Sequence, residues 1–166
     1  MRRFTSAAAA AIVVLAFAIA PACSETLDDK AALAGLSEVK IAFDLTNGDG
    51  KALLKQLEVI DETRQSLLKQ GVKPEIVIAF RGPATKLVQT DQTQIKAEDR
   101  ENAAAIAKKI SALRSADGVA GIEQCGVAVR LAGTNEADVV PGIKIVGNGW
   151  ISLAAYQAKG YGYISP

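Results

Sequence analysis

Short apolar runs recur along the chain after residue 38 and predict the strands of a sheet. Pro74–Phe80 is apolar at nearly every position, which is typical of a strand that is covered on both faces by helices. Glycine, proline or asparagine follows most of these runs and favours a turn there. The predicted strands span residues 39–45, 74–80, 119–124, 143–146 and 161–164.

Amphipathic stretches separate these runs and predict helices. Between Lys51 and Gln70, leucine and isoleucine recur at three- and four-residue steps, and Gly71 then ends the helix. Residues 89–99 are polar without periodicity, which predicts either a plain surface loop or a functional one. Further helices are predicted over 101–114 and 150–159 and from residue 126 onward, with short helical turns at 84–88 and 134–139.

The alternation of strands and helices predicts the fold class. Strand–helix–strand units with short connections favour parallel strands and right-handed crossovers. We therefore expect residues 38–166 to form one α/β domain, a three-layer α/β/α sandwich with a mostly parallel sheet of about five strands. In such folds the ligand crevice lies beyond the carboxyl ends of the strands.

The first 24 residues have the layout of a secretory signal peptide. Met1–Arg3 is basic, Ala7–Ala20 is apolar but short for a membrane span, and small residues follow. We expect residues 1–24 to be removed, residues 25–37 to form a linker, and the mature protein to be periplasmic or secreted without a membrane span. Cys23 leaves a lipid anchor open, although the leucine usual three residues before an acylated cysteine is absent.

The charge balance excludes several classes of partner and mechanism. Without Arg2 and Arg3, the 19 basic residues become 17 against 18 acidic ones, which is close to neutral. No basic patch remains to indicate binding to nucleic acid or anionic lipid. The chain has no histidine, which excludes Ser-His-Asp and Cys-His mechanisms and most zinc sites.

The loop over residues 47–51 contains glycines and a lysine before a helix, but it matches no ligand motif. It lacks the GxxxxGK[ST] spacing of a phosphate loop and the alternating oxygen ligands of a calcium loop. No GxGxxG follows the first predicted strand. A turn with Asp49 as the helix cap accounts for the loop. We expect no metal and no cofactor.

Cys125 lies where the predicted strand 119–124 meets the next helix. Unpaired N–H groups and the helix dipole at such a place favour an ionised, nucleophilic thiol. Once the leader is removed, this is the only cysteine, so an internal disulfide is excluded. The alternative is a small apolar side chain at a strand end, because unpaired cysteines are commonly buried.

Two further polar residues, Asn47 and Arg81, follow predicted strands, so we expect them to line one crevice together with Cys125. Arg81 could hold an anionic sulfur species, or it could simply face water. Gly82 and Gly126, the next residues after Arg81 and Cys125, complete the predicted substrate-binding set. Arg130 is predicted to face water.

Four aromatic residues, Trp150, Tyr156, Tyr161 and Tyr163, are close together near the C-terminus. Filling of the core is the default interpretation of such residues. A subunit interface is the alternative, because aromatic residues are enriched at interfaces.

Three segments carry a resemblance to a known family: residues 122–128 (IEQCGVA), 140–146 (VPGIKIV) and 157–164 (QAKGYGYI). Together they resemble the exported branch of the DsrE/DsrF-like family. The resemblance implies an α/β/α sandwich that assembles into trimers or hexamers. It also implies sulfur handling, with Cys125 carrying a persulfide between donor and acceptor proteins. Members often have histidine where this chain has Arg81, so the resemblance carries no proton-transfer role to that position and leaves an electrostatic role open.

Two functions of different classes follow from these observations. The first is a sulfur carrier or sulfurtransferase-like relay that uses the single Cys125. The second is a non-catalytic oligomeric binding or scaffold module with the same fold. A redox-sensing thiol that forms a dimer through Cys125 is a third and weaker option.

Overall fold

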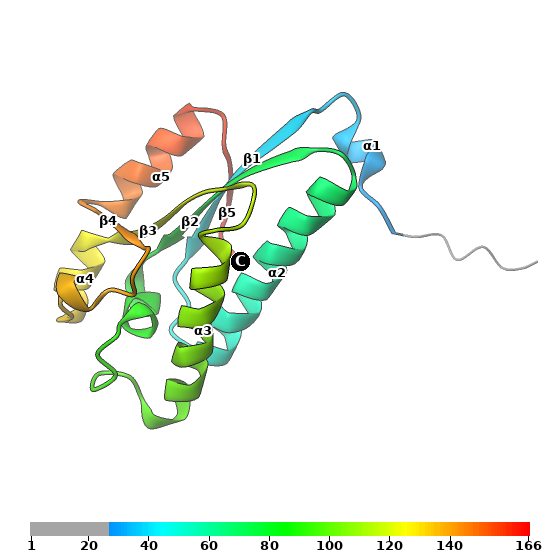
Figure 1. Cartoon of the computed structure of the whole chain (residues 1–166). Coiled ribbons are helices and arrows are strands. Elements are labelled where there is room, and N and C mark those ends of the chain that lie inside the picture. Colours follow the sequence, from blue (N-terminus) through cyan, green and yellow to red (C-terminus); the bar gives the residue numbers. More distant parts are fainter. Residues whose placement is uncertain (1–26) are drawn as a thin grey trace, which may run out of the picture.

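The structure is a computed structural model that describes residues 27–166 (Figure 1). Five strands form one sheet in the order β4-β3-β2-β1-β5, and every neighbouring pair is parallel. The strands are β1 (Glu38–Leu45), β2 (Lys73–Phe80), β3 (Val119–Cys125), β4 (Lys144–Val146) and β5 (Gly162–Ile164). The predicted sheet of about five mostly parallel strands is confirmed.

Helices cover both faces of this sheet (Figure 1). Helices α2 and α3 pack side by side over the larger apolar core on one face. Helix α5 covers the other face, where Leu153 and Tyr161 pack on Ala79 and its neighbours. The helices are α1 (Lys30–Leu33), α2 (Gly50–Lys69), α3 (Arg100–Leu113), α4 (Gly126–Ala132) and α5 (Gly149–Ala158), with 3-10 turns η1 (Gly82–Val88), η2 (Ala97–Asp99) and η3 (Glu136–Asp138). The predicted α/β/α sandwich is therefore confirmed.

The path of the chain across the sheet places α5 on its own face. From β1 to β4 each crossover moves toward the same edge, and right-handed crossovers keep α2, α3 and α4 on one side. After β4 the chain crosses back to β5, beside β1, so α5 lies on the opposite side. Helix α4, which follows β3, and helix α5, which follows β4, thus lie on opposite faces of the sheet. Open α/β sheets form a ligand crevice between two neighbouring strands whose connections diverge in this way.

The three central strands end at the same level. Leu45 of β1 is in register with Phe80 of β2, and Phe80 is in register with Gln124 of β3. Arg81, which follows the last residue of β2, and Cys125, the last residue of β3, therefore lie side by side at the carboxyl edge of the sheet. This is the arrangement that the sequence predicted for them.

The local signals at the helix ends act as predicted. The carboxylate of Asp49 accepts a hydrogen bond from the N–H of Ala52 at 2.7 Å and caps α2. Gly71 follows α2 with a φ of 77°, a conformation that glycine adopts without strain. The short helix α1, with Leu33 packed against the core, is a feature that the linker interpretation of residues 25–37 did not include.

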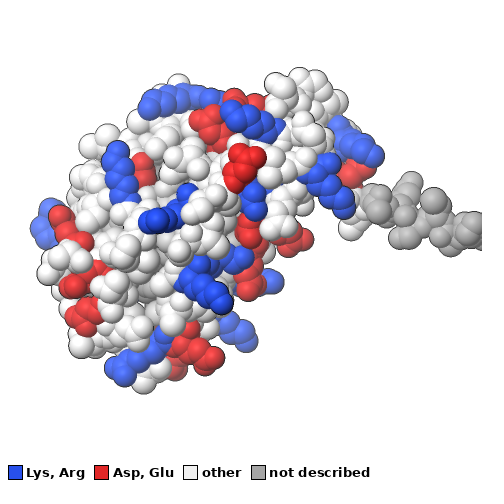
Figure 2. Space-filling view, in the orientation of Figure 1, with Lys and Arg blue, Asp and Glu red and all other residues white. Residues whose placement is uncertain are grey.

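The predicted signal peptide and Cys23 lie outside the described residues. Within residues 27–166, no helix combines the length and the apolar character needed to cross a bilayer. On the face of the molecule shown in Figure 2, basic and acidic side chains are interspersed.

Helix α5 is held to the sheet by a buried carboxylate. Glu123 of β3 accepts hydrogen bonds from the hydroxyls of Ser152 and Tyr156, the latter at 2.9 Å. Burial, reinforced by the hydrogen bond to Glu123, raises the pKa of Tyr156 to about 12. The phenol therefore keeps its proton in the folded protein at pH values where it loses it in the unfolded chain.

We expect this contact to make the protein sensitive to alkali. A raised pKa contributes stability that is complete below the unfolded value of about 10 and is lost as the pH rises toward 12. Urea unfolding at pH 8, 10 and 11 should show the free energy of unfolding falling, and Tyr156→Phe should reduce that fall by on the order of 1 kcal/mol. If the free energy of unfolding falls equally with pH in the unmodified protein and in Tyr156→Phe, the buried contact of Tyr156 is not the cause of the alkali sensitivity.

Candidate functional site

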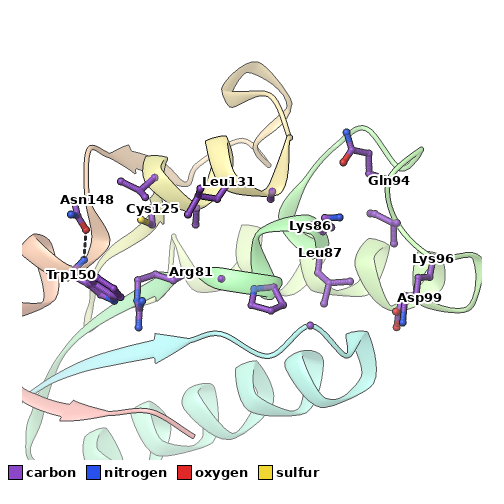
Figure 3. A pocket seen from close by; sticks show the side chains of 17 residues that line it. Arg81, Lys86, Leu87, Gln94, Lys96, Asp99, Cys125, Leu131, Asn148 and Trp150 are labelled. Carbon is purple, nitrogen blue, oxygen red and sulfur yellow. Dashed lines mark hydrogen bonds between the residues drawn. The ribbon is translucent and has the colours of Figure 1, made fainter.

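A cleft of about 700 Å³ opens beyond the carboxyl ends of β2 and β3. Helix α4 forms one wall, and η1 with the loop before η2 forms the other (Figure 3). Cys125 lies at one end of the cleft near Arg81 and Trp150, and Gln94, Lys96 and Asp99 lie at the other end (Figure 3). The polar stretch 89–99, for which the sequence predicts either a plain surface loop or a functional one, therefore contributes to the cleft wall.

The thiol of Cys125 is free and its residue is 6% exposed, and it lines the cleft. The sequence predicted that the helix following Cys125 would act on the sulfur, but α4 has only seven residues and the Cys125 side chain makes no capping hydrogen bond to it. Instead, the N–H of Gly149 donates a hydrogen bond to Sγ at 3.2 Å. Gly149 is the first residue of α5, so the positive end of a different helix reaches the sulfur.

The residues between β4 and α5 allow the N-terminus of α5 to come close to Cys125. The Asn148 side chain accepts a hydrogen bond from the N–H of Trp150 at 3.0 Å and caps α5. A Cβ atom at position 149 would lie 2.7 Å from Cδ of Arg81 and 3.0 Å from Cβ of Cys125. Only glycine allows the backbone to come this close to both side chains.

Gly149→Ala is expected to destabilise the protein by about 1–3 kcal/mol, because the side chains of Arg81 and Cys125 must move away from the added Cβ atom. It should also change the rate at which iodoacetamide alkylates Cys125. Gly147→Ala in the same turn is the matched control, because a Cβ there meets no atom within 4 Å. That control should stay within about 0.5 kcal/mol. Equal effects of the two variants would argue against a required close approach.

Arg81 is held in place by two neighbouring residues, Asp44 and Trp150. Its Nε donates a hydrogen bond to the carboxylate of Asp44 at 2.8 Å, and its Nη2 donates to the second oxygen of the same carboxylate. Its guanidinium also lies 5.7 Å from the ring centre of Trp150, within the range of a cation–π contact. The hydrogen bond from Arg81 to Asp44, together with the negative charge of the Asp44 carboxylate, raises the pKa of Arg81 above its ordinary value.

Asp44 connects this arginine to the C-terminal strand. It is 1% exposed, and it accepts a hydrogen bond from the hydroxyl of Tyr163 at 2.6 Å. That hydrogen bond and burial raise the pKa of Tyr163, so the phenol remains a donor at neutral pH. A strand at the edge of the sheet thus helps to fix the arginine beside Cys125.

The charged side chains that line the cleft are mainly basic. Lys86 and Lys96 are exposed and form no ion pair within residues 27–166. The single lining carboxylate, Asp99, accepts a hydrogen bond from the N–H of Gly50 at 3.0 Å. The cleft therefore favours anions over cations.

The predicted site residues fall into two groups. Arg81, Gly82 and Cys125 all line the cleft. Asn47 is not among its lining residues, and its side chain accepts a hydrogen bond from the N–H of Asp49 at 2.9 Å within the turn before α2. Gly126 lies against β4, where an added Cβ would meet the Val146 carbonyl oxygen at 3.1 Å. These two residues have structural roles in the turn and in the packing of α4.

Arg130, which was predicted to face water, is exposed and lines a separate cavity on the other side of α4. Of the four C-terminal aromatic residues, Tyr161 is buried and Tyr156 is half-buried, whereas Trp150 and Tyr163 are exposed. The interpretation as core filling therefore describes Tyr161 but not Trp150 or Tyr163, and a subunit interface at these two residues stays a prediction.

Sequence reasoning missed Asp44, Gly149 and the local role of Trp150. Asp44 is a lone charge near the end of an apolar strand, which is a signal for a buried ion pair. Gly149 and Trp150 carried no signal, because nothing local indicates which strand end α5 approaches. Within residues 27–166 there is no group of three or more histidine, cysteine, aspartate or glutamate side chains that could hold a metal ion.

No known family model matches this chain. An uncharacterized protein of Aquifex aeolicus (strain VF5) is 25% identical over 128 residues, which are 77% of this chain and 56% of that protein. The chain thus spans about half the length of the curated relative that it matches. The structure is similar to that of MTH1491 from Methanobacterium thermoautotrophicum, a protein of unknown function, with a TM-score of 0.60 and 18% identity over 77% of this chain and 99% of that one. This likeness shows a shared fold.

Proposed function

We propose that this chain is a DsrE/DsrF-like sulfur carrier in which Cys125 accepts sulfane sulfur as a persulfide and passes it on. The observation that carries the proposal is the position of this free thiol at one end of a cleft, with an N–H group of α5 on Sγ and Arg81 beside it. The sequence resemblance around Cys125 and the α/β/α fold support the same assignment.

The site chemistry suits an anionic sulfur. The N–H of Gly149 and the guanidinium of Arg81 both favour negative charge on Sγ or on a sulfur attached to it. In the transfer step the Cys125 thiolate attacks the outer sulfur of a donor persulfide, R–S–S⁻, and R–S⁻ leaves with the electrons of the broken bond. Cys125 is the only thiol among residues 27–166, so no neighbouring cysteine discharges the persulfide.

The test is sulfur loading of the full chain carrying Cys23→Ser, so that Cys125 is its single thiol. After incubation with inorganic polysulfide and desalting, the intact mass should increase by one sulfur atom. Addition of a small acceptor thiol should then remove it. If no sulfur is gained and Cys125 is alkylated no faster than free cysteine, the carrier function is wrong.

We also propose that copies of this chain associate through the outer face of α5. Trp150 is 69% exposed and Ile151 70% exposed, although large apolar side chains are usually covered. Tyr163 of the edge strand β5 is also exposed, and through Asp44 it is linked to Arg81, against which Trp150 lies. A second copy of the same chain is the occupant that we propose, in keeping with the trimers or hexamers that the family resemblance implies.

Ile151→Lys is expected to shift the protein toward the monomer in light scattering after size exclusion. A charge placed in an apolar interface loses its water without gaining a partner. Leu68→Lys on α2 is the matched control, because Leu68 is also exposed but lies on the helix layer of the opposite face. If the unmodified chain is monomeric at micromolar concentration, self-association through α5 is wrong.

The signal-like residues 1–24 lead us to propose a periplasmic or secreted location, with attachment through an acylated Cys23 as the variant to test. Proteins in that compartment that accept the sulfur from Cys125 would be the partners. Mass spectrometry of the exported protein would show whether the mature chain begins near residue 25 or carries lipid on Cys23.

The second candidate function is a binding module that uses the cleft without sulfur chemistry. The low exposure of Cys125 and the many apolar residues that line the cleft favour it. It predicts that Cys125→Ala leaves stability, assembly and phenotype unchanged.

A further inference from the structure

The cleft is much larger than the transfer of a single sulfur atom requires. Its volume of about 700 Å³ falls within the range of pockets that enclose a small organic molecule. From Cys125 it runs between α4 and η1 toward the loop at Lys96 (Figure 3). The sulfur lies at the end of the cleft that Arg81 and Trp150 also line, and Cys125 is only 6% exposed there. A donor therefore has to bring its sulfur into the cleft.

The walls next to the sulfur are mostly apolar. Pro83 and Leu87 of η1 lie on one side, and Val127 and Leu131 of α4 lie on the other. Trp150 adds an exposed aromatic ring at the Cys125 end (Figure 3). An apolar group inserted between these side chains gains free energy by leaving water.

The same cleft is electropositive. Lys86 and Lys96 have no ion-pair partner within the described part of the chain, and the only lining carboxylate, Asp99, already accepts a hydrogen bond from Gly50. Nη1 of Arg81 donates no hydrogen bond to residues 27–166, since its ion pair with Asp44 uses Nε and Nη2. Apolar walls combined with free positive charge select an amphipathic anion.

We propose that the sulfur donor for Cys125 is a small organic anion that carries sulfane sulfur on an apolar group, such as an aryl or alkyl thiosulfonate. This inference rests on the proposed function and names the substrate class of the same site. The apolar group lies between η1 and α4, and the anionic sulfur end meets Cys125, Arg81 and the N-terminus of α5.

The reaction balances without a further reactant. The Cys125 thiolate attacks the outer sulfur of R–SO₂–S⁻, a new S–S bond forms on Sγ, and the S–S bond of the donor breaks. The electron pair of that bond leaves on the sulfinate, R–SO₂⁻. The products are the Cys125 persulfide anion and the sulfinate, with two negative charges before and after. The sulfonyl sulfur is reduced and the Cys125 sulfur is oxidised.

Binding is tested separately from chemistry with the full chain carrying Cys23→Ser and Cys125→Ser. Trp150 is the only tryptophan of the chain and lines the cleft, so its fluorescence reports occupancy. Benzenesulfonate and methanesulfonate, which transfer no sulfur, are the probes. We expect benzenesulfonate to bind at least about tenfold more tightly, because burial of its ring gains more than the 1.4 kcal/mol that a factor of ten requires.

A pair of matched variants locates the binding site. Leu131→Ser removes an apolar cleft wall from a residue that is 79% exposed, so the fold should tolerate it. It should weaken benzenesulfonate binding by about fivefold and methanesulfonate binding very little. Leu68→Ser on α2, outside the cleft, should change neither affinity. Equal affinities of the two probes, or equal effects of the two variants, would overturn the inference.

Loading of the chain with Cys125 intact separates this inference from the proposed function. Benzenethiosulfonate should load sulfur at least about tenfold faster than methanethiosulfonate, with each rate divided by that of free cysteine with the same donor. Loading from polysulfide without any preference for the aryl donor overturns the substrate class and leaves the carrier function standing. Tight benzenesulfonate binding without loading from any donor overturns the carrier function and the donor role with it.

Discussion

Cys125→Ser is expected to abolish sulfur loading at this position completely while the protein stays folded. A serine hydroxyl forms no persulfide, but it has a similar shape and can still accept the hydrogen bond from the N–H of Gly149. The free energy of unfolding should therefore change by about 1 kcal/mol or less. Intact mass after treatment with polysulfide measures the loading, and urea unfolding measures the stability.

The matched control is Cys23→Ser, which removes the other cysteine of the chain and should load as the unmodified protein does at Cys125. If the sulfur mass disappears in Cys23→Ser and persists in Cys125→Ser, then the N-terminal cysteine is the acceptor and the assignment is wrong. If neither variant nor the unmodified chain gains sulfur, the binding-module function is favoured instead.

Asp44→Asn is expected to lower the free energy of unfolding by about 3 kcal/mol. The substitution removes the charge that neutralises Arg81, whose side chain is only 17% exposed, and leaves a cation without its partner. If the amide nitrogen takes the place of Oδ2, which accepts hydrogen bonds from both Arg81 and Tyr163, a donor replaces that acceptor. For a domain of this size the melting temperature should fall by roughly 10 °C.

Asp28→Asn is the control for the loss of a carboxylate as such. Asp28 pairs with Lys30, whose side chain is 80% exposed, and surface pairs of this kind contribute little. Its midpoint of unfolding should match that of the unmodified protein. If Asp44→Asn also leaves the midpoint unchanged, Arg81 finds another partner or water, and the ion pair does not hold the site together.

Much of the fold could be predicted because the local signals agree with one another. The apolar run at 74–80 predicts a strand covered on both faces, and β2 is the central strand between the two helix layers. Asp49 and Gly71 mark the ends of α2 by capping and by a positive φ, both of which depend only on neighbouring residues.

The candidate site could be predicted only in part. Arg81 and Cys125 end neighbouring strands, and parallel register places the residues after such ends side by side. Asn47 was grouped with them for the same reason, but its side chain is used within its own turn. The position of a strand end determines where the residue that follows it lies. The hydrogen bonds of that residue's side chain determine whether the side chain reaches the crevice.

Local patterns are enough to place the strands, the helices, their alternation and Cys125 at the end of a buried strand, because periodicity and caps are properties of neighbouring residues. The surroundings of the sulfur depend instead on contacts between distant segments. The crossing of the chain from β4 back to β5 places α5 on the opposite face, and it brings Gly149 onto a sulfur 24 residues earlier in the chain. Likewise, Asp44 holds Arg81 and Tyr163 across 37 and 119 residues. Contacts over such separations depend on how the layers pack, and no local pattern encodes them.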